Sequence, residues 1–508
     1  MKTIERSKME KSKRRIDERL GAPPAIGSPT PVIGGGNIRY EVGEKTKAIS
    51  HGGIGLVMGL IEEIGLAEKI DERLHLFKIH APYHESDHVI AVALNGLCGG
   101  TTLDDLELLR QDEVFLDALG ADRIPDPTTV GDFCRRFDEA RILDLMDAIN
   151  RARLQVWKRQ PKEFLERATL DVDGTLCATT GCCKEGMEFS YKGVCWGYHP
   201  LVVSLANTGE VLFLQNRPGN RPSHEGAWWF LDDAIDLVER AGFRKILLRG
   251  DTDFSQCHKL DDWNARNVSF VFGFDATPTL CEIAENLPQS AWSKLQRRDK
   301  HPRQGKSRSR PENVKERIVI ERQFENIRTV CEEIAEFQYR PGKCQREYRI
   351  VVVKKNLTVE KGENHLFDDV RYFFYITNLT GEAEEVVWEA NDRCNQENHI
   401  EQLKNGIRAL HAPVNSLLAN WAYMVMMALG WNLKIWLALR LPAGRGNRSK
   451  KHRAEKRTLL RMEFKRFANA IINIPCQILR TGRRIVYRIL SWNPWQPVFY
   501  RLARVLRQ

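Results

Sequence analysis

The sequence lacks the cysteine patterns of secreted and zinc-binding proteins. Its 12 cysteines are scattered and include no Cys-x-x-Cys pair. The only closely spaced set of possible zinc ligands comprises Cys182, Cys183, Cys195 and His199. Two of these cysteines are adjacent, which is poor geometry for a structural zinc site. Charged residues rather than an apolar run follow Met1, so we expect no secretory signal and a cytoplasmic protein with reduced thiols.

Long hydrophobic runs are also missing. The longest apolar stretch, residues 417–441, is interrupted by four polar or charged residues, which are Asn420, Asn432, Lys434 and Arg440. A membrane span requires about 20 nearly uninterrupted apolar residues. We therefore expect a buried helix in this region and no association with a membrane.

The overall composition is that of a folded protein with more than one domain. Hydrophobic residues make up 42% and charged residues 28% of the 508 residues, which excludes a disordered chain, a collagen-like repeat and a small disulfide scaffold. A chain of this length is too long for a single hydrophobic core, so two or more domains are expected.

Positive charge is concentrated at one end of the chain. There are 77 Lys and Arg residues against 67 Asp and Glu residues, a net charge of +10. Residues 441–508 contain 17 Lys and Arg residues and only two acids, so this tail carries +15 and the rest of the chain −5. A tail of one sign is typical of proteins that bind polyanions, because each neutralised phosphate releases a condensed counterion. A solvated surface that aids solubility is the alternative.

Changes in composition and hydrophobic periodicity predict six segments along the chain. They are a flexible basic and Gly/Pro-rich arm (1–45), a helical DNA-binding domain (46–162), the first part of an α/β core (163–275), a β-rich insertion with a basic loop (276–365), the second part of the core with an acidic helix (366–440), and a basic helical tail (441–508). The core is therefore expected to be discontinuous in sequence.

The helical domain contains one motif that suits DNA recognition. Pro125-Asp-Pro-Thr-Thr129 predicts the capped start of a short helix, and Arg135 and Arg136 follow it. A short capped helix that presents arginines is compatible with a helix-turn-helix reader of DNA. An ordinary capped helix of a bundle is the alternative.

The segment from residue 163 to 275 has the pattern of an RNase H-like (retroviral-integrase-type) core. A strand, a hairpin, an amphipathic helix and two further strands are expected in turn at residues 170–173, 199–215, 228–241, 245–249 and 269–272. Asn207-Thr-Gly209 is a hairpin turn signal. This order of elements is that of the RNase H-like fold.

The insertion begins where this pattern breaks. A basic run between residues 294 and 310 includes Arg297 and Arg298, and strands are expected afterwards at 317–320 and 348–353. The apolar pattern expected of the core resumes with a strand at 372–377 and a helix from about residue 386 to 410. We expect a mostly β module whose basic loop is a further candidate DNA contact.

Three acidic residues are placed as phosphodiester chemistry requires. Asp173 and Asp251 each follow a candidate strand, and Glu397 lies on the later helix. Two divalent ions about 4 Å apart serve such chemistry well, and Mg²⁺ prefers carboxylate oxygens. Arg393 and Lys404 share a helix face with Glu397 and are candidate phosphate ligands. Asp171 points to the same face of its strand as Asp173 and is the alternative ligand.

Each acid also has an ordinary explanation when taken singly. Asp173 could cap a turn, Asp251 could belong to a loop with Asp253, and Glu397 could form an exposed helical ion pair with Arg393. What favours an active site is the conjunction of two strand-end aspartates and an acidic helix in this order.

These motifs resemble those of the DDE transposases of bacterial insertion sequences. The matching segments are Leu170-Asp-Val-Asp-Gly-Thr175, Leu247-Leu-Arg-Gly-Asp-Thr-Asp-Phe254 and Arg393-x3-Glu397-x6-Lys404. The closest group looks like the thirteen-eighty family, within the larger group that carries a Tyr-x2-Arg-x3-Glu-x6-Lys signature. The signature's tyrosine falls at Ala390 here, and the nearest aromatic residue is Trp388.

The resemblance implies an enzyme that cuts and joins ends of double-stranded DNA. Asp173, Asp251 and Glu397 would be the catalytic residues and would bind two Mg²⁺ ions, for which Mn²⁺ could substitute. The implied partners are terminal inverted repeats, target DNA and a second copy of the chain. The predicted DNA or phosphate contacts are Arg393, Lys404, Lys192, Arg217, Arg297, Arg298, Arg135 and Arg136.

Two other classes of function remain open at this point. An RNase H-like nuclease would hydrolyse DNA without strand transfer. A domesticated DNA-binding protein would bind DNA ends without metal-dependent cleavage.

Overall fold

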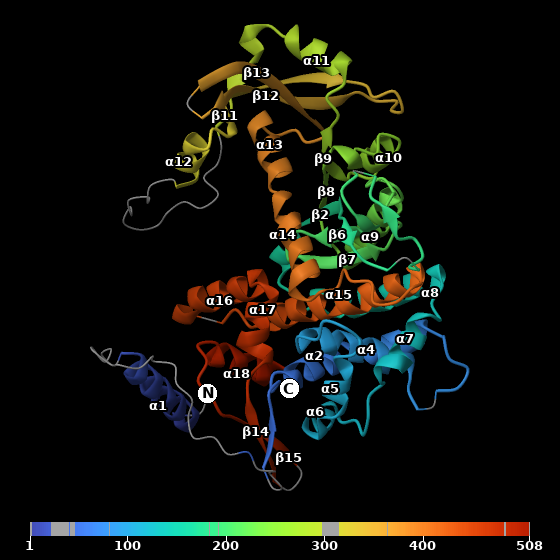
Figure 1. The fold of residues 1–508 in the computed structure, drawn as a ribbon, viewed down its shortest axis with the longest axis vertical. Helices are drawn as coiled ribbons and strands as arrows, with labels where there is room; N and C mark the ends of the chain where they lie inside the picture. The colour runs from blue at the N-terminus through green and yellow to red at the C-terminus, as the bar shows by residue number, and fades with distance from the viewer. Residues whose placement is uncertain are drawn as a thin grey trace. The chain divides into compact units, whose positions relative to one another are not determined.

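The computed structural model consists of two compact units (Figure 1). The helical unit comprises Met1–Gln160, Cys183–Glu185 and Gln402–Gln508, and the sheet unit comprises Pro161–Cys182 and Gly186–Glu401. The residues that the structure describes are 3–21, 40, 46–80, 82–181, 183–191, 193–296, 314–362, 364–444, 446–481 and 484–506.

The sheet unit is built on a nine-stranded mixed sheet. Five of its strands lie in the order β7-β6-β2-β8-β9. They are β2 (Arg167–Gly174), β6 (Leu201–Leu205), β7 (Glu210–Gln215), β8 (Lys245–Gly250) and β9 (Ser269–Phe274). The β2 strand is antiparallel to β6 and parallel to β8, and β8 is parallel to β9. The expected strand positions in this segment are confirmed.

Both faces of these five strands are covered, which explains their apolar sequences. Every residue of β6 is buried, as are all but one of the residues of β8. The amphipathic helix α9 (Ala227–Ala241) packs on β2, β6, β7 and β8, and α14 (Cys394–Glu401) also contacts β2. Near-continuous apolar runs are typical of strands that are buried on both sides. The predicted hairpin turn is also present, with Gly209 at φ 80°.

Four antiparallel strands extend this sheet beyond β9. They are β13 (Asn364–Thr377), β12 (Tyr348–Lys361), β11 (Glu325–Tyr339) and the short β10 (Ser293–Lys294). Residues Phe374 to Thr377 of β13 pair with β9, while the whole of β13 pairs with β12. The insertion therefore continues the core sheet, and the expected boundary at residue 365 falls inside β13.

One expected strand of the insertion is wrong. Residues 317–320 lie in the helix α12 (Val314–Glu321). The run Ile-Val-Ile has high strand propensity, but the charges on either side of it have helical spacing. Arg317 pairs with Glu321 one turn later at 3.5 Å, an interaction that supports a helix and is impossible along a strand.

The remaining elements of the sheet unit are small. A separate three-stranded sheet has the order β3-β5-β4. The elements are β3 (Cys177–Ala178), β4 (Glu188–Phe189), β5 (Trp196–Tyr198), α10 (Leu260–Ala265), α11 (Pro278–Glu285) and the 3₁₀ turns Lys162–Leu165, Thr252–Phe254 and Gln289–Ala291.

The expected long helix at 386–410 is divided. It forms α13 (Ala383–Asn391) and α14, with Asp392 and Arg393 between them. A π-helical turn, Gln402–Gly406, follows and belongs to the helical unit. The break gives α13 and α14 independent contacts with the sheet.

The helical unit is organised around α15 (Leu417–Arg440). This helix is buried from Ala419 to Leu439. It packs against α2 (Ile54–Ile64), α4 (Glu85–Leu97), α7 (Pro127–Cys134), α8 (Glu139–Trp157), α16 (Ser449–Arg461) and α18 (Gln496–Val505). The unit also contains α3 (Leu66–Arg73), α5 (Leu106–Arg110) and α6 (Glu113–Leu119). By length and composition α15 could cross a membrane, but its apolar window is wholly buried, which agrees with the predicted core helix.

Both ends of the chain differ from expectation. The segment expected to be a flexible arm contains the helix α1 (Thr3–Leu20). The basic tail is only partly helical, because β14 (Cys476–Thr481) and β15 (Arg484–Ile489) form a hairpin that pairs with β1 (Lys47–Ile49). The run Arg484-Ile-Val-Tyr-Arg-Ile489 is rich in β-branched and aromatic residues, which favour a strand over a helix.

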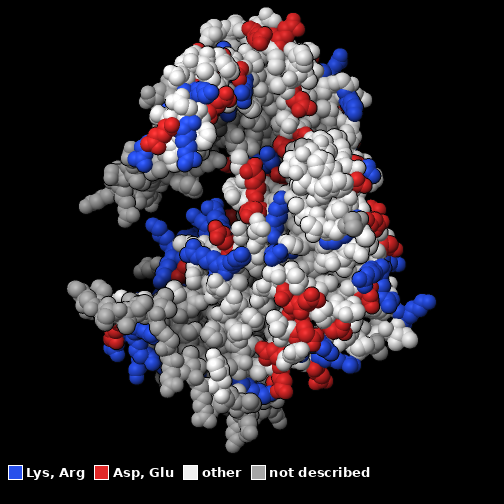
Figure 2. All heavy atoms as spheres, viewed as in Figure 1, with Lys and Arg blue, Asp and Glu red and all other residues white. Residues whose placement is uncertain are grey.

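The tail is an integral part of the helical unit. Its buried side chains include Leu459, Phe464, Phe467, Ile471 and Leu502. The remaining helical turns here are α17 (Phe464–Phe467), Ala468–Ile472 and Gly446–Arg448. Lys and Arg side chains gather on the surface at the place of α16 (Figure 2). The expected boundary at residue 440 therefore separates residues that share one core.

Lys434 is an unusual member of that core. Its side chain is fully buried on α15, and its Nζ donates a hydrogen bond to the Leu460 carbonyl oxygen at 3.0 Å. The same Nζ lies 4.1 Å from the ring centroid of Trp431. Burial lowers the pKa of Lys434 to about 7, because desolvation penalises the charged form.

This burial predicts a pH-dependent cost to stability. An unfolded lysine keeps a pKa near 10.4, so between pH 7 and 10 the unfolded chain binds a proton that the folded chain does not. The free energy of unfolding of the wild type should therefore rise with pH in this window by about 1 kcal/mol per pH unit relative to Lys434→Met. Urea unfolding of both proteins at several pH values measures this, and a difference independent of pH would contradict it.

Candidate active site

Two parallel strands of the core end together, and each is followed by an aspartate. Asp173 is the next-to-last residue of β2, and Asp251 comes directly after β8. The strands are in register, with Asp171 opposite Arg249. Asp173 and Asp251 each lie two positions beyond that pair. Because parallel strands in register end at the same edge of a sheet, both carboxylates lie at one edge.

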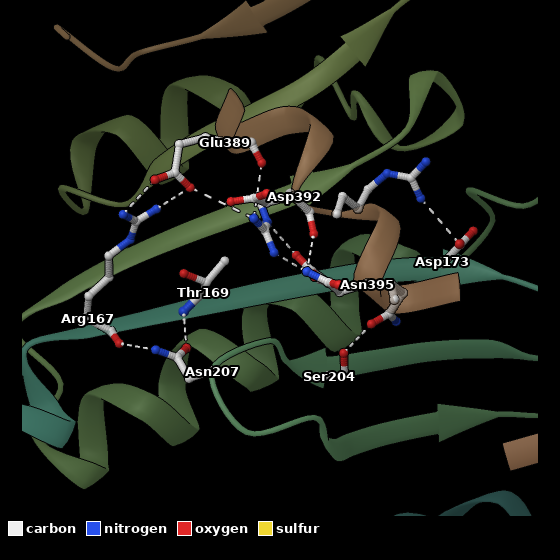
Figure 3. Close-up of polar contacts among 12 residues, drawn as sticks. Arg167, Thr169, Asp173, Ser204, Asn207, Glu389, Asp392 and Asn395 are labelled. Atoms are coloured by element: carbon white, nitrogen blue, oxygen red, sulfur yellow. Dashed lines mark hydrogen bonds and ion pairs between the residues drawn. The ribbon is translucent and has the colours of Figure 1, made fainter. Parts of the chain in front are cut away.

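Asp173 is mostly buried and faces a single cation. Its side chain is 14% exposed, and an Oδ atom lies 3.3 Å from Nη1 of Arg393 (Figure 3). Burial raises the pKa of Asp173 to about 6, and the negative charges of Asp251 and Glu397 also raise it, while Arg393 and the Gly174 backbone lower it. Asp251 and Glu397 are therefore close enough to Asp173 for their charges to act on it in a poorly solvated space.

Asp251 is held by its own loop. Its side chain accepts a hydrogen bond from the Asp253 backbone N–H at 3.0 Å and caps the 3₁₀ turn Thr252–Phe254. The ordinary alternative for Asp251, a loop that includes Asp253, is thus present as a local cap. This bond uses one carboxylate oxygen to orient the side chain at the end of β8.

Glu397 is placed by the residue before it. Gln396 is fully buried, and its Oε1 accepts a hydrogen bond from the Ser204 hydroxyl of β6 (Figure 3). Its Nε2 donates to the Val202 carbonyl oxygen at 3.4 Å. These contacts attach the first turn of α14 to the core sheet, and Glu397 follows directly. Gln396 is a functional residue that the sequence alone does not reveal, since its one signal is a polar side chain beside an expected catalytic acid.

A buried ion-pair network attaches α13 to the same strands. Arg249 donates two hydrogen bonds to the Asp171 carboxylate, at 2.7 and 2.9 Å, and a third to the Glu389 carbonyl oxygen at 3.0 Å. The Glu389 carboxylate in turn accepts two hydrogen bonds from Arg167, at 2.9 and 2.7 Å (Figure 3). Burial lowers the pKa of Arg249, but its hydrogen bonds to Asp171 and the charge of Asp171 outweigh this, so the pKa is raised.

This network distinguishes the two aspartates of β2. The Asp171 carboxylate is 1% exposed and both of its oxygens accept hydrogen bonds from Arg249. Asp173 makes only a longer, single contact to Arg393 at its oxygen Oδ2. The alternative assignment of Asp171 as a metal ligand therefore disagrees with its contacts, and Asp171 acts as a structural partner of Arg249.

A pocket of about 350 Å³ lies beside Asp251. It is bounded by the ends of β8 and β9, by the break between α13 and α14, and by the aromatic run Tyr372, Phe373, Phe374 and Tyr375 of β13. Ala390, at the position of the signature's tyrosine, and Arg393 both line it. A small residue at position 390 leaves this space open next to the acidic edge.

The donor set has the chemistry of a site for a hard divalent cation. Within the described part of the chain, no three His, Cys, Asp or Glu side chains form a ready-made metal cage. The three carboxylates nevertheless come from separate elements, and the charges of Asp251 and Glu397 act on Asp173. Oxygen ligands suit Mg²⁺, and a bound cation would offset the burial and the neighbouring negative charges that raise the pKa of Asp173. The residue types present therefore suit such an ion.

Three of the expected DNA contacts belong to the helical unit. Lys404 belongs to the π-helical turn of the helical unit. Arg135 is exposed and pairs with Asp132 at 2.6 Å. The Arg136 guanidinium carbon lies 5.2 Å from the ring centroid of Phe77. Their proposed contacts with DNA stay predictions. Lys192, Arg297 and Arg298 lie outside the described residues.

Arg217 is buried, contrary to its expected role as a DNA or phosphate contact. The residue is 4% exposed. Its Nε and Nη1 atoms donate hydrogen bonds to backbone carbonyl oxygens of His199, Pro222, Ser223 and Glu225. Burial lowers its pKa to about 10. Its guanidinium holds a loop together from inside, so the expected DNA contact is wrong for this residue.

Comparison with known proteins gives one family match. The model of the family described as "Transposase DDE domain group 1" matches residues 38–508. No curated protein matches. Among solved structures, the chain is similar to that described as "Cryo-EM structure of piggyBac transposase synaptic complex with hairpin DNA (SNHP)", with 11% identity, 84% coverage of each chain and a TM-score of 0.39.

The buried network predicts a large cost for removing its arginine. Arg249→Met leaves the Asp171 carboxylate buried without its partner, so we expect the free energy of unfolding to fall by about 3–5 kcal/mol. Arg266→Met is the matched control, because Arg266 also pairs with two acids but at the surface, at 2.6 and 2.8 Å. The control should cost less than about 1 kcal/mol. Equal losses in urea unfolding would contradict the assigned role of Arg249.

The raised pKa of Asp173 predicts that this residue lowers stability at neutral pH. Its pKa is about 6 in the folded chain and near 3.9 in the unfolded chain, so wild-type stability falls as pH rises from about 4 to 6. In metal-free buffer, Asp173→Asn should be more stable than wild type at pH 7 by on the order of 1–3 kcal/mol. The difference should vanish near pH 4. Chemical unfolding at both pH values tests this, and a less stable variant at pH 7 would refute it.

Proposed function

The chain belongs to the transposase DDE domain group 1 family and is therefore a DDE transposase, and from this premise we propose that it serves a bacterial insertion sequence of the thirteen-eighty family. The proposed reaction is cleavage of DNA at the element ends followed by strand transfer into target DNA. The observation that carries the proposal is that Asp173 and Asp251 lie at the same edge of two adjacent parallel strands, where the charge of Glu397 also acts on Asp173.

The proposed fold of the catalytic core is RNase H-like. The strand order β7-β6-β2-β8-β9 supports it, together with the antiparallel β6 and β7 and the parallel β8 and β9. The strands β10 to β13 then form an insertion between β9 and the helix that carries Glu397. In this proposal the insertion extends the core sheet rather than forming a separate domain.

The proposed cofactor is Mg²⁺, as two ions, with Mn²⁺ as a substitute. Asp173, Asp251 and Glu397 would hold the ions. Such ions, when bound, lower the pKa of an attacking water or hydroxyl and stabilise the leaving oxygen. Binding requires the ionised form of Asp173, so affinity should increase as pH rises through about 6.

Arg393 has a distinct role in this proposal. In the absence of substrate its guanidinium neutralises part of the charge on Asp173 at 3.3 Å. It also lines the pocket beside Asp251, so it is available to a phosphate that approaches the acidic edge. Arginine suits this position because its planar group can bond a carboxylate and a phosphate. Lys404 is proposed as a second phosphate ligand.

Two successive phosphoryl transfers would complete the reaction. Hydrolysis of one strand at the element end forms a bond from water to phosphorus, breaks the phosphorus–O3′ bond and releases a 3′-hydroxyl. The oxygen of that hydroxyl then forms a bond to the phosphorus of a target phosphodiester, and the bond from this phosphorus to the 3′-oxygen of the target strand breaks. Positioning and charge stabilisation suffice for both steps, so no covalent protein intermediate is needed. The proposed partners are terminal repeats, target DNA and a second copy of the chain, in the cytoplasm.

Substitution of the three acids tests the proposal. Asp173→Ala, Asp251→Ala and Glu397→Gln should each reduce strand cleavage and transfer by on the order of 10³-fold or more, because each removes a carboxylate on which the charge stabilisation depends. DNA binding should remain near the wild-type level. Gel assays with end-labelled DNA carrying the element ends measure both activities in Mg²⁺.

Glu401→Gln provides a matched control, since Glu401 lies one turn after Glu397 on the same helix. It should retain activity. Wild-type activity in any of the three acid variants would overturn the assignment. Cleavage by the wild type without joining would instead indicate a nuclease, and binding without cleavage would indicate a DNA-binding protein.

A further inference from the structure

The helix α16 carries a stripe of four exposed cations along one side. They are Lys450, Arg453, Arg457 and Arg461, at spacings of three or four residues. Such spacings place side chains above one another on one helix face. At 1.5 Å per residue, the stripe extends for roughly 16 Å. In Figure 2 the blue side chains gather at the place that α16 has in Figure 1.

The opposite face of α16 is committed to the helical unit. Leu459 is buried, and the Lys456 Nζ donates to the Leu439 carbonyl oxygen at 2.7 Å and to Gln160 Oε1 at 3.2 Å. Glu455, the one acidic residue of the helix, pairs with Arg501 of α18. The helix therefore directs Glu455 and Leu459 toward the rest of the unit, and the charged side chains that it presents to solvent are all positive.

The stripe has no evident use within the fold. None of its four cations forms an ion pair with another described residue of the chain. Arg453, Arg457 and Arg461 repel one another at successive intervals of four residues, which weakens a helix. Other surface arginines of the same unit are paired instead, such as Arg151 with Asp147 at 2.7 Å. An unpaired row of like charges on a rigid element fits an extended anionic partner.

We propose that this stripe binds the sugar-phosphate backbone of duplex DNA. The inference rests on the proposed function, which supplies DNA as the partner, and adds a contact surface outside the acidic site. Contact with phosphates alone carries no sequence information, so the stripe would hold flanking or target DNA in any sequence. An anionic membrane fits less well, because the helix has no exposed apolar face to enter a bilayer.

Neutralisation of the stripe tests the proposal. The variant carries Lys450→Gln, Arg453→Gln, Arg457→Gln and Arg461→Gln, which keep helix propensity and touch no buried residue. Truncation of the tail is unsuitable, since it would remove Phe464, Phe467 and Leu502 from the core. Affinity for a duplex of random sequence is measured against salt concentration without divalent ions. The slope of log K against log salt should decrease by about 3 to 4, near 0.9 per phosphate lost.

A second quadruple variant controls for net charge. It replaces four paired arginines of the same unit by Gln, namely Arg73, Arg110, Arg141 and Arg151. Its slope should remain near that of the wild type. The thermal midpoint of the stripe variant should be no lower than that of the wild type, which shows that it is folded.

The outcomes separate this inference from the proposed function. Equal slopes in both quadruple variants, with wild-type cleavage intact, would overturn the stripe alone. A stripe variant that loses binding to anionic phospholipid vesicles but not to DNA would overturn it as well. A wild type that neither binds duplex DNA nor cleaves element ends would overturn the proposed function and the stripe together.

Discussion

Asp171 and Arg249 face one another across two parallel strands and are almost completely shielded from water. The guanidinium also bonds the Glu389 carbonyl oxygen, so one side chain joins β2, β8 and α13. A buried charge is costly unless its partner is correctly placed, so this pair tolerates little displacement of any of the three elements. Asp173 and Asp251 lie two residues farther along the same strands. The register that satisfies the pair therefore also sets the acidic edge.

Asp173 lies near two other acids, whose negative charges disfavour its ionised form. The charges of Asp251 and Glu397 act on Asp173 in a space where water screens poorly, and Arg393 offsets part of the charge on Asp173. The favourable contacts that keep the acids together are next to them in sequence: the Arg249 pair, the Asp253 N–H and the Gln396 bonds. Each acid is thus positioned by a neighbour with no direct part in the chemistry. The stabilising contacts thus lie one or two residues away in sequence from the acids that destabilise the fold.

Much of the core could be predicted from the sequence, because strands covered on both faces have continuous apolar runs. Asp173 and Asp251 were recognisable since each follows such a run. The role of Arg249 was not, because it depends on which strand lies beside β8 and in what register. For the same reason the burial of Arg217 was missed: sequence shows an arginine, while the loop that surrounds it is a tertiary feature. In helix α12 the strand propensity of Ile-Val-Ile is overridden by charges at helical spacing, whereas in the tail hairpin the strand-like composition agrees with the pairing to β1.

The strand β13 belongs to two structures at once. Its last residues pair with β9 in the core, while its whole length of 14 residues pairs with β12. A strand of this length spans roughly 45 Å, and the aromatic residues near its core end line the pocket beside Asp251. Because β13 is one continuous strand, the residues that line the pocket and those that pair with β12 far from the core share a single backbone. A ligand that displaced the far end of this strand would therefore also strain the wall of the pocket.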